Sequence, residues 1–158
     1  MKKTKHDWNA LEDYLNVHAA VIGQYQKYMT RPTDYSHNWL NEEYLELSAS
    51  FTITTHLGNA IKISIEKDVE IKTLTPPRGK RIGRRLARLD AYTYVAYQVG
   101  KGCLIRYCSP HDQLFDTSVD HHEFHHKHDY SSGREIISNM GTDWPHVDEF
   151  LEEVMSTL

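Results

Sequence analysis

Apolar and polar residues alternate along two neighbouring segments in the first half of the chain. In residues 45–53 every odd position is apolar and every even position is polar. Isoleucines recur at the odd positions of residues 61–65, after a turn signal at Leu57-Gly58-Asn59. A period of two is typical of a half-buried β-strand, so the two segments predict a β-hairpin. Lys67-Asp68 predicts a second tight turn or a bulge before residues 69–71.

Two more strands are indicated further along the chain. Residues 75–79 break the alternation with two prolines and a glycine. Residues 89–98 are then rich in aromatic and β-branched residues, a composition typical of strands. A turn at residues 99–102 leads to a return strand at residues 103–108. The pattern predicts an antiparallel sheet of about five strands over residues 44–109, followed by a histidine-rich loop at residues 110–130.

A helical period appears near both ends of the chain. Apolar residues between positions 8 and 30 recur at spacings of three, four and seven, with Asp7 as a cap and Pro32 beyond the end. Residues 31–38 are expected to form a loop. A second helix is predicted for residues 144–157, with Pro145 in its first turn. The whole of residues 1–158 predicts a single α+β domain with both helices packed on one face of the sheet.

Composition narrows the class of protein. No apolar run approaches the ~20 residues of a transmembrane helix, and the N-terminal lysines are not followed by an apolar signal-peptide core. We therefore expect a cytoplasmic protein with no membrane partner. The two cysteines, Cys103 and Cys108, would lie on opposite faces of a strand and cannot bridge each other there. Cys108 is a weak candidate ligand or nucleophile, and a small buried residue is the favoured interpretation.

Positive charge is concentrated in one segment. The chain has a net charge of -4, yet residues 72–88 hold seven basic side chains and no acidic one. Such a segment predicts a contact with an anionic partner, nucleic acid first and an acidic protein second, and a solvated loop without a partner stays open. The RNA-binding candidates are Arg78, Lys80, Arg81, Arg84, Arg85 and Arg88.

The densest chemistry lies in a histidine-rich stretch, residues 103–130. Five of the 11 histidines fall within the eight residues 121–128. One hypothesis is RNA cleavage without a metal, in which histidines act as general acid and base and cations stabilise the phosphate charge. Arg106 and Lys127 are candidates for holding the phosphate, and Tyr107 for stacking a base or orienting a histidine. The acid and base candidates are His111, His126 and His128.

Two other interpretations of the histidines stay open. Zinc or another divalent metal would be bound by side chains on one face of a strand or helix, completed by Asp120, Glu123 or Asp129. The candidate ligands in that case are His121, His125, His126 and His128. Alternatively the histidines are structural and bond to backbone carbonyls and to the interleaved acidic residues. The spacing alone does not commit the stretch to a metal.

Three short motifs in this order resemble the TumE-like toxins of bacterial toxin–antitoxin operons. They are Arg106-Tyr107, Pro110-His111 and His125-His126-Lys127-His128, followed by a short C-terminal amphipathic helix. The resemblance covers roughly residues 45–158 and leaves out the N-terminal helix. Family members tend to have Asp-Asn where this chain has Cys108-Ser109. If that aspartate is catalytic in the family, the activity of this chain is expected to be weakened, to be altered, or to depend on Asp112 or Asp120.

The resemblance implies a cytoplasmic toxin that acts on RNA and is neutralised by a cognate protein antitoxin. We therefore expect an endoribonuclease whose site centres on His111, His126 and His128 with Arg106 and Lys127. His121 and His122 lie outside the resembling motifs and are expected to be bystanders. The alternative is a non-enzymatic module that binds a metal or a protein partner through the histidines. A homo-oligomer is compatible with either function.

Overall fold

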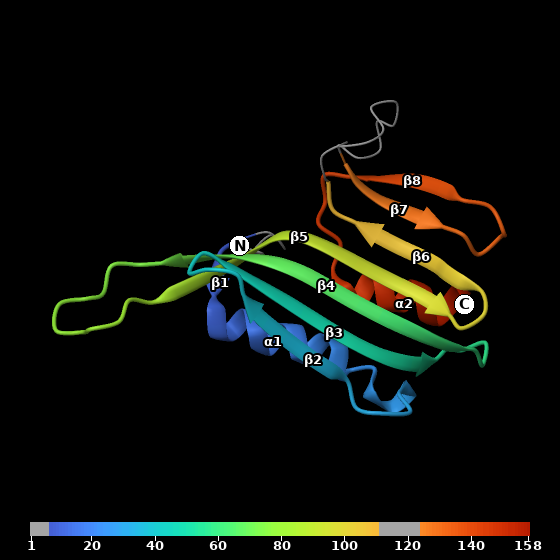
Figure 1. The fold of residues 1–158 in the computed structure, drawn as a ribbon, viewed down its shortest axis with the longest axis horizontal. Coiled ribbons are helices and arrows are strands. Elements are labelled where there is room, and N and C mark those ends of the chain that lie inside the picture. Colours follow the sequence, from blue (N-terminus) through green and yellow to red (C-terminus); the bar gives the residue numbers. More distant parts are fainter. Residues whose placement is uncertain (1–6, 111–123) are drawn as a thin grey trace.

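The computed structural model describes residues 7–110 and 124–158, and shows an α+β fold built on one large antiparallel sheet (Figure 1). The strands are β1 (Asn9–Ala10), β2 (Asp34–Trp39), β3 (Tyr44–Thr54), β4 (Ala60–Thr73), β5 (Arg85–Gln98), β6 (Gly102–Cys108), β7 (His125–Asp129) and β8 (Ile136–Gly141). The helices are α1 (Leu11–Gly23), the 3₁₀ helix η1 (Gln26–Tyr28) and α2 (Val147–Thr157).

The strands from β2 to β8 follow each other across the sheet in chain order, and the short β1 pairs with the start of β5. The predicted β3–β4 hairpin is confirmed, with Phe51 opposite Ile63. β4 continues without a turn through Lys67 and Asp68, and its register with β5 shifts between Asp68 and Val69. The extra residue at this shift is Asp90 of β5, so the bulge lies in the neighbouring strand, and neither the turn nor the bulge predicted at Lys67-Asp68 interrupts β4.

The sheet is larger than the five strands predicted, because β2 and β7 were expected to be loops and no element was predicted for the residues of β8. All six residues of β2 are exposed, so no apolar alternation marks it, yet it pairs with β3 along its whole length. β8 has no fully buried residue either. Such outer strands are held by backbone hydrogen bonds, which leave no hydrophobic pattern in the sequence.

The first helix is shorter than the predicted 8–30. Asn9 and Ala10 pair with β5, so α1 begins at Leu11 and its N-cap is Ala10 rather than Asp7. The helix ends at Gly23, consistent with the poor helix propensity of glycine. α2 begins at Val147 with His146 at its N-cap, three residues later than predicted, and runs to Thr157.

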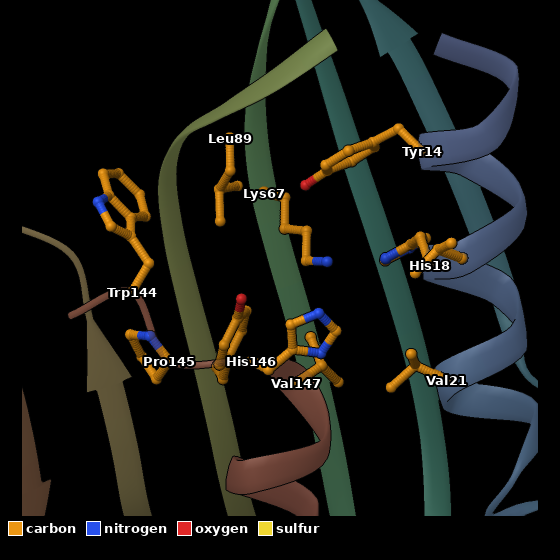
Figure 2. A pocket seen from close by; sticks show the side chains of 11 residues that line it. Tyr14, His18, Val21, Lys67, Leu89, Trp144, Pro145, His146 and Val147 are labelled. Carbon is orange, nitrogen blue, oxygen red and sulfur yellow. The ribbon is translucent and has the colours of Figure 1, made fainter. Parts of the chain in front are cut away.

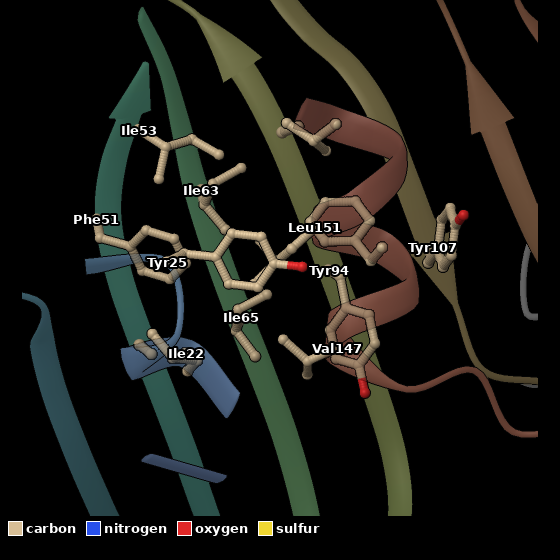
Figure 3. Packing of buried hydrophobic residues seen from close by; sticks show 14 of the residues in the cluster. Ile22, Tyr25, Phe51, Ile53, Ile63, Ile65, Tyr94, Tyr107, Val147 and Leu151 are labelled. Atoms are coloured by element: carbon tan, nitrogen blue, oxygen red, sulfur yellow. The ribbon is translucent and has the colours of Figure 1, made fainter. Parts of the chain in front are cut away.

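Both helices pack on the same face of the sheet, where they form one core with it (Figure 3). Ile22 of α1 and Leu151 of α2 pack with Ile63, Ile65 and Tyr94 of the central strands. The Tyr25 hydroxyl after α1 donates a 2.9 Å hydrogen bond to Glu152 of α2 and joins the two helices directly. No helix in the described part of the chain is long and apolar enough to cross a membrane.

Candidate metal centre

The pairing of β6 with β7 determines which predicted site residues meet. Arg106 lies opposite His128, Tyr107 opposite Lys127, and Cys108 opposite His126. Directly opposed residues share a face of the sheet, and successive residues alternate between faces. Arg106, Cys108 and the two histidines therefore lie on the face away from the helices, whereas Tyr107 and Lys127 lie on the helix-covered face.

Cys108, His126 and His128 form a compact cluster on that outer face. Their sulfur and nitrogen ligand atoms all lie within 4.8 Å of one another. The side chains are nearly inaccessible, since Cys108 is 7% exposed, His126 0% and His128 5%. One thiol and two imidazoles are ligand types that zinc and related transition metals prefer. The cluster is therefore a candidate metal centre, in which His126 and His128 follow Cys108 by 18 and 20 positions in the sequence.

The hydrogen bonds of the two histidines place a ring proton on Nδ1 in both. His126 Nδ1 lies 2.8 Å from the Phe124 carbonyl oxygen, and His128 Nδ1 lies 2.7 Å from a Glu135 carboxylate oxygen. Both partners are acceptors, so each Nδ1 is the donor and the lone pair of the neutral ring is on Nε2. Metal-binding histidines are typically oriented in this way by a carbonyl or a carboxylate.

Glu135 is itself held in place beside His128. The Tyr130 hydroxyl donates a 2.8 Å hydrogen bond to the same carboxylate oxygen, Oε1. The bonds from His128 and Tyr130 lower the pKa of the Glu135 carboxyl, so this group is ionised at neutral pH. Nothing in the sequence pattern pointed to Glu135, because it lies in the turn between β7 and β8 and its place beside His128 depends on that turn.

Cys108 borders a groove on the outer face of the sheet. Arg106, Thr93 and Asp68 line the same groove. Burial raises the pKa of the Cys108 thiol, and the neighbouring Arg106 opposes that rise by its charge and by a hydrogen bond. A thiol in these surroundings keeps its proton at neutral pH, so it is poorly suited to act as a nucleophile, whereas a bound metal ion would displace the proton.

Two residues predicted for catalysis, Tyr107 and Lys127, are bound to α2 instead. The Tyr107 hydroxyl donates to Glu153 Oε2, and Lys127 Nζ lies 2.6 Å from Glu153 Oε1. Burial and the bond to Glu153 raise the pKa of Tyr107 above its ordinary range. The strand period separates these two side chains from Arg106, His126 and His128, so the five do not form one site.

His125 also lies away from the cluster. Its Nδ1 is 2.8 Å from the Tyr92 hydroxyl, and its ring stacks on the Tyr92 ring with an interplanar angle of 6°. Trp144 contacts the same imidazole edge-on, with 4.6 Å between ring centroids. His125 therefore packs between aromatic residues on the helix-covered face. His111, His121 and His122, together with Asp112, Asp120 and Glu123, lie outside the described residues.

The predicted RNA-binding residues lie at the other end of the sheet. Arg78, Lys80, Arg81 and Arg84 belong to the β4–β5 arm, residues 74–84, which extends beyond the sheet on the side away from β7 and β8 (Figure 1). Eight residues of β5 separate Arg85 from the level of Cys108, about 27 Å at the rise of a strand. The arm and the cluster are therefore two separate features.

Two of the basic residues already have partners within the chain. The Arg88 guanidinium lies 2.7 Å from Glu70 and 4.5 Å from the centroid of the Trp8 ring. Arg85 lies over the Trp39 ring, 5.3 Å from its centroid. Contacts with these partners restrict both arginines, so the arm itself offers the more available positive charge.

Comparisons with known proteins identify no relative of this chain. No protein-family model matches it, and no curated protein or solved structure is significantly similar to it. The resemblance to TumE-like toxins stays a prediction from the motifs alone.

Proposed function

We propose that this protein is a cytoplasmic metal-binding module that holds a zinc-class ion with Cys108, His126 and His128. The observation that carries the proposal is the cluster itself, in which three nitrogen and sulfur ligand atoms lie within 4.8 Å of one another. The Phe124 carbonyl and the Glu135 carboxylate support it, because they accept from Nδ1 and orient both imidazoles as the partners of metal-binding histidines typically do.

The surroundings of the cluster favour a transition metal over acid–base catalysis. An imidazole that is 0–5% exposed cannot easily reach the ribose hydroxyl of an RNA strand, whereas burial does not hinder a metal ligand. Both cysteines are free thiols, as expected in a reducing compartment, where a thiol is available to a metal. Three protein ligands leave a fourth position of a tetrahedral ion for another group.

The first test is metal analysis of protein purified without a histidine tag. We expect about one zinc per chain, and we expect cobalt(II) substitution to give a sulfur-to-metal charge-transfer band. Cys108→Ser should abolish that band, while the matched variant Cys103→Ser should keep it, because Cys103 lies outside the cluster. Absence of stoichiometric metal, or an unchanged band in Cys108→Ser, would refute the proposal.

A second test addresses the carboxylate behind His128. Glu135→Gln should lower the zinc affinity about 10- to 100-fold, since the loss of a carboxylate partner weakens the basicity and orientation of a histidine ligand. Tyr130→Phe is the control, because it removes the other bond to Glu135 and keeps the carboxylate. Competition titration against a chelator of known affinity measures both variants. Equal weakening in the two would show that Glu135 has no specific role.

As a second candidate we propose the endoribonuclease of a toxin–antitoxin pair. The observation that favours it is that Arg106 shares the outer face with His126 and His128, so a cation for phosphate adjoins two imidazoles. Purified protein should then cleave RNA in the presence of a chelator, and His126→Ala should lose that activity. Expression should arrest bacterial growth unless a cognate protein antitoxin is present. Cleavage that stops on chelation would instead assign the activity to the metal centre.

A further inference from the structure

A lysine interrupts the apolar face that β4 turns toward the helices. The inward-facing residues of β4 are Ile61, Ile63, Ile65, Lys67, Val69 and Ile71. Lys67 lies between the core around Ile65 and the smaller core around Val69, next to the bulge. An ammonium group at such a position is costly unless something compensates its charge, so its surroundings indicate what it could bind.

Lys67 points into a small cavity that α1, β4, β5 and the start of α2 enclose (Figure 2). The cavity has a volume of about 50 Å³, and most of its wall is apolar. Space of this size exceeds that of one water molecule and is enough for a molecule of a few non-hydrogen atoms. Its apolar walls come from Val17, Val21, Leu89, Trp144, Pro145 and Val147.

His18 faces Lys67 across this cavity (Figure 2). Its side chain is 7% exposed, and neither ring nitrogen has a hydrogen-bond partner among the described residues. Burial, with a smaller contribution from the charge of Lys67, lowers the pKa of His18 to about 3. At neutral pH the imidazole is therefore an uncharged group with an unused N–H donor, which is unfavourable when the cavity is empty.

No carboxylate compensates Lys67 within the described part of the chain, since none forms an ion pair with it. Burial lowers the pKa of Lys67 to about 8, so the group is still mainly an ammonium ion at neutral pH. The N-terminal end of α2 adds to the positive electrostatic potential in the cavity. Val147, the first residue of the helix, lines the cavity, and no side chain caps the helix. The first turn of α2 holds two acidic residues, Asp148 and Glu149, and Asp148 Oδ1 lies 3.1 Å from His146 Nδ1.

We propose that this cavity binds a short-chain monocarboxylate. The carboxylate would accept hydrogen bonds from Lys67 Nζ and a His18 N–H, and the alkyl tail would pack against Val17, Val21 and Leu89. One ammonium ion matches one negative charge, and apolar walls suit an alkyl group. A phosphate dianion would bring a second charge and no apolar part, so the cavity offers it a poorer fit. The proposal does not depend on the metal centre.

The experiment is an NMR titration of isotope-labelled full-length chain with sodium propionate, with sodium chloride keeping the ionic strength constant. We expect saturable shifts of the His18 ring and Lys67 side-chain signals. Lys67→Met should weaken the affinity at least tenfold. The matched control is Lys62→Met, on the same strand but pointing to the other face, and it should bind like the parent.

Several outcomes would overturn the proposal. These are shifts that do not saturate, equal affinity in Lys67→Met and the parent, or phosphate binding more tightly than propionate. Circular dichroism checks that each variant is folded. If Lys67→Met is not, His18→Phe provides the second measurement, because it keeps the lysine and removes the N–H donor, and an affinity equal to that of the parent would also contradict the assignment.

Discussion

Individual histidines of this chain differ in what surrounds them, and the surroundings determine their chemistry. His18 is neutral in an apolar cavity, His125 stacks on Tyr92 and meets Trp144 edge-on, and His128 is bonded to the carboxylate of Glu135. A count of histidines in the sequence treats these residues as equivalent. The structure separates a candidate ligand from a packing residue and from a candidate donor to an anion.

His18 should make the stability of the protein depend on pH. In the unfolded chain its imidazole takes up a proton near the ordinary pKa of 6.5, whereas in the folded chain it stays neutral down to about pH 3. The unfolded state binds more protons in this window, so the free energy of unfolding falls as the pH falls. Between pH 7.5 and pH 5 the loss from this group is about 2 kcal/mol.

Urea unfolding of the parent and of His18→Gln at these two pH values measures that loss. The parent should lose more stability on acidification than the variant does, because glutamine takes up no proton. Tyr14 lines the same cavity and is neutral at both values, and Lys67, with a pKa of about 8, is mainly protonated at both, so these two groups contribute alike in the parent and in the variant. An identical loss in the two proteins would show that His18 is protonated in the folded state.

The sequence predicted which residues would gather near the site, but not which face of the sheet each would occupy. His126, His128 and Arg106 were predicted and do share a face, whereas Tyr107 and Lys127 were predicted with them and lie on the opposite one. To separate the two groups, one must know that residues 125–129 form a strand and in which register this strand pairs with residues 102–108. Lys67 was visible as a break in an alternating pattern, but the same break is also typical of a turn.

At the scale of elements, α2 contacts both β6 and β7 and holds them together. Glu153 of this helix bonds to Tyr107 of β6 with one carboxylate oxygen and to Lys127 of β7 with the other. Both bonds are partly shielded from water, since the Lys127 and Glu153 side chains are 23% and 20% exposed. The helix thereby positions the strand pair whose other face holds the metal-centre candidates.

Glu153→Gln should loosen β7 more than the rest of the sheet. The change removes a charge-assisted bond to Lys127 and leaves that ammonium without its partner, at a cost of about 1–3 kcal/mol. Native-state hydrogen exchange should show faster exchange of the β7 amides. Glu152→Gln is the control, because Glu152 bonds to Tyr25 after α1 instead. Equal acceleration of β7 in both variants would contradict a specific role of Glu153.

Elements with a buried face were predictable and elements without one were not. β3 and β4 each turn isoleucine or leucine inward at alternate positions, and α2 buries one apolar stripe, so their periods are visible in the sequence. β7 consists of His125-His126-Lys127-His128-Asp129, and three of these side chains are buried although none is hydrophobic. A pattern based on hydrophobicity cannot detect such a strand.

At the scale of the whole molecule, the arm of residues 74–84 and the metal-centre candidates are far enough apart to act independently. Replacing Arg78, Lys80 and Arg81 by serine should weaken binding to single-stranded RNA and reduce the magnitude of its salt slope by about 2, if all three contact phosphates. The zinc content should not change. Fluorescence anisotropy at several salt concentrations measures the slope, and Lys101→Ser, in the β5–β6 turn, is the control. An unchanged slope would exclude the arm as a phosphate-binding surface.

The contact between α1 and α2 has a consequence for biosynthesis. Tyr25 and Glu152 are 127 positions apart, and α2 contributes Phe150, Leu151 and Val154 to the same core as Ile22. A ribosome makes the central strands β3 and β4 well before this helix, so their inward isoleucines have no complete cover until α2 has emerged. The sheet of the nascent chain is therefore expected to need protection from aggregation, by a chaperone or by low local concentration, until translation of α2 is finished.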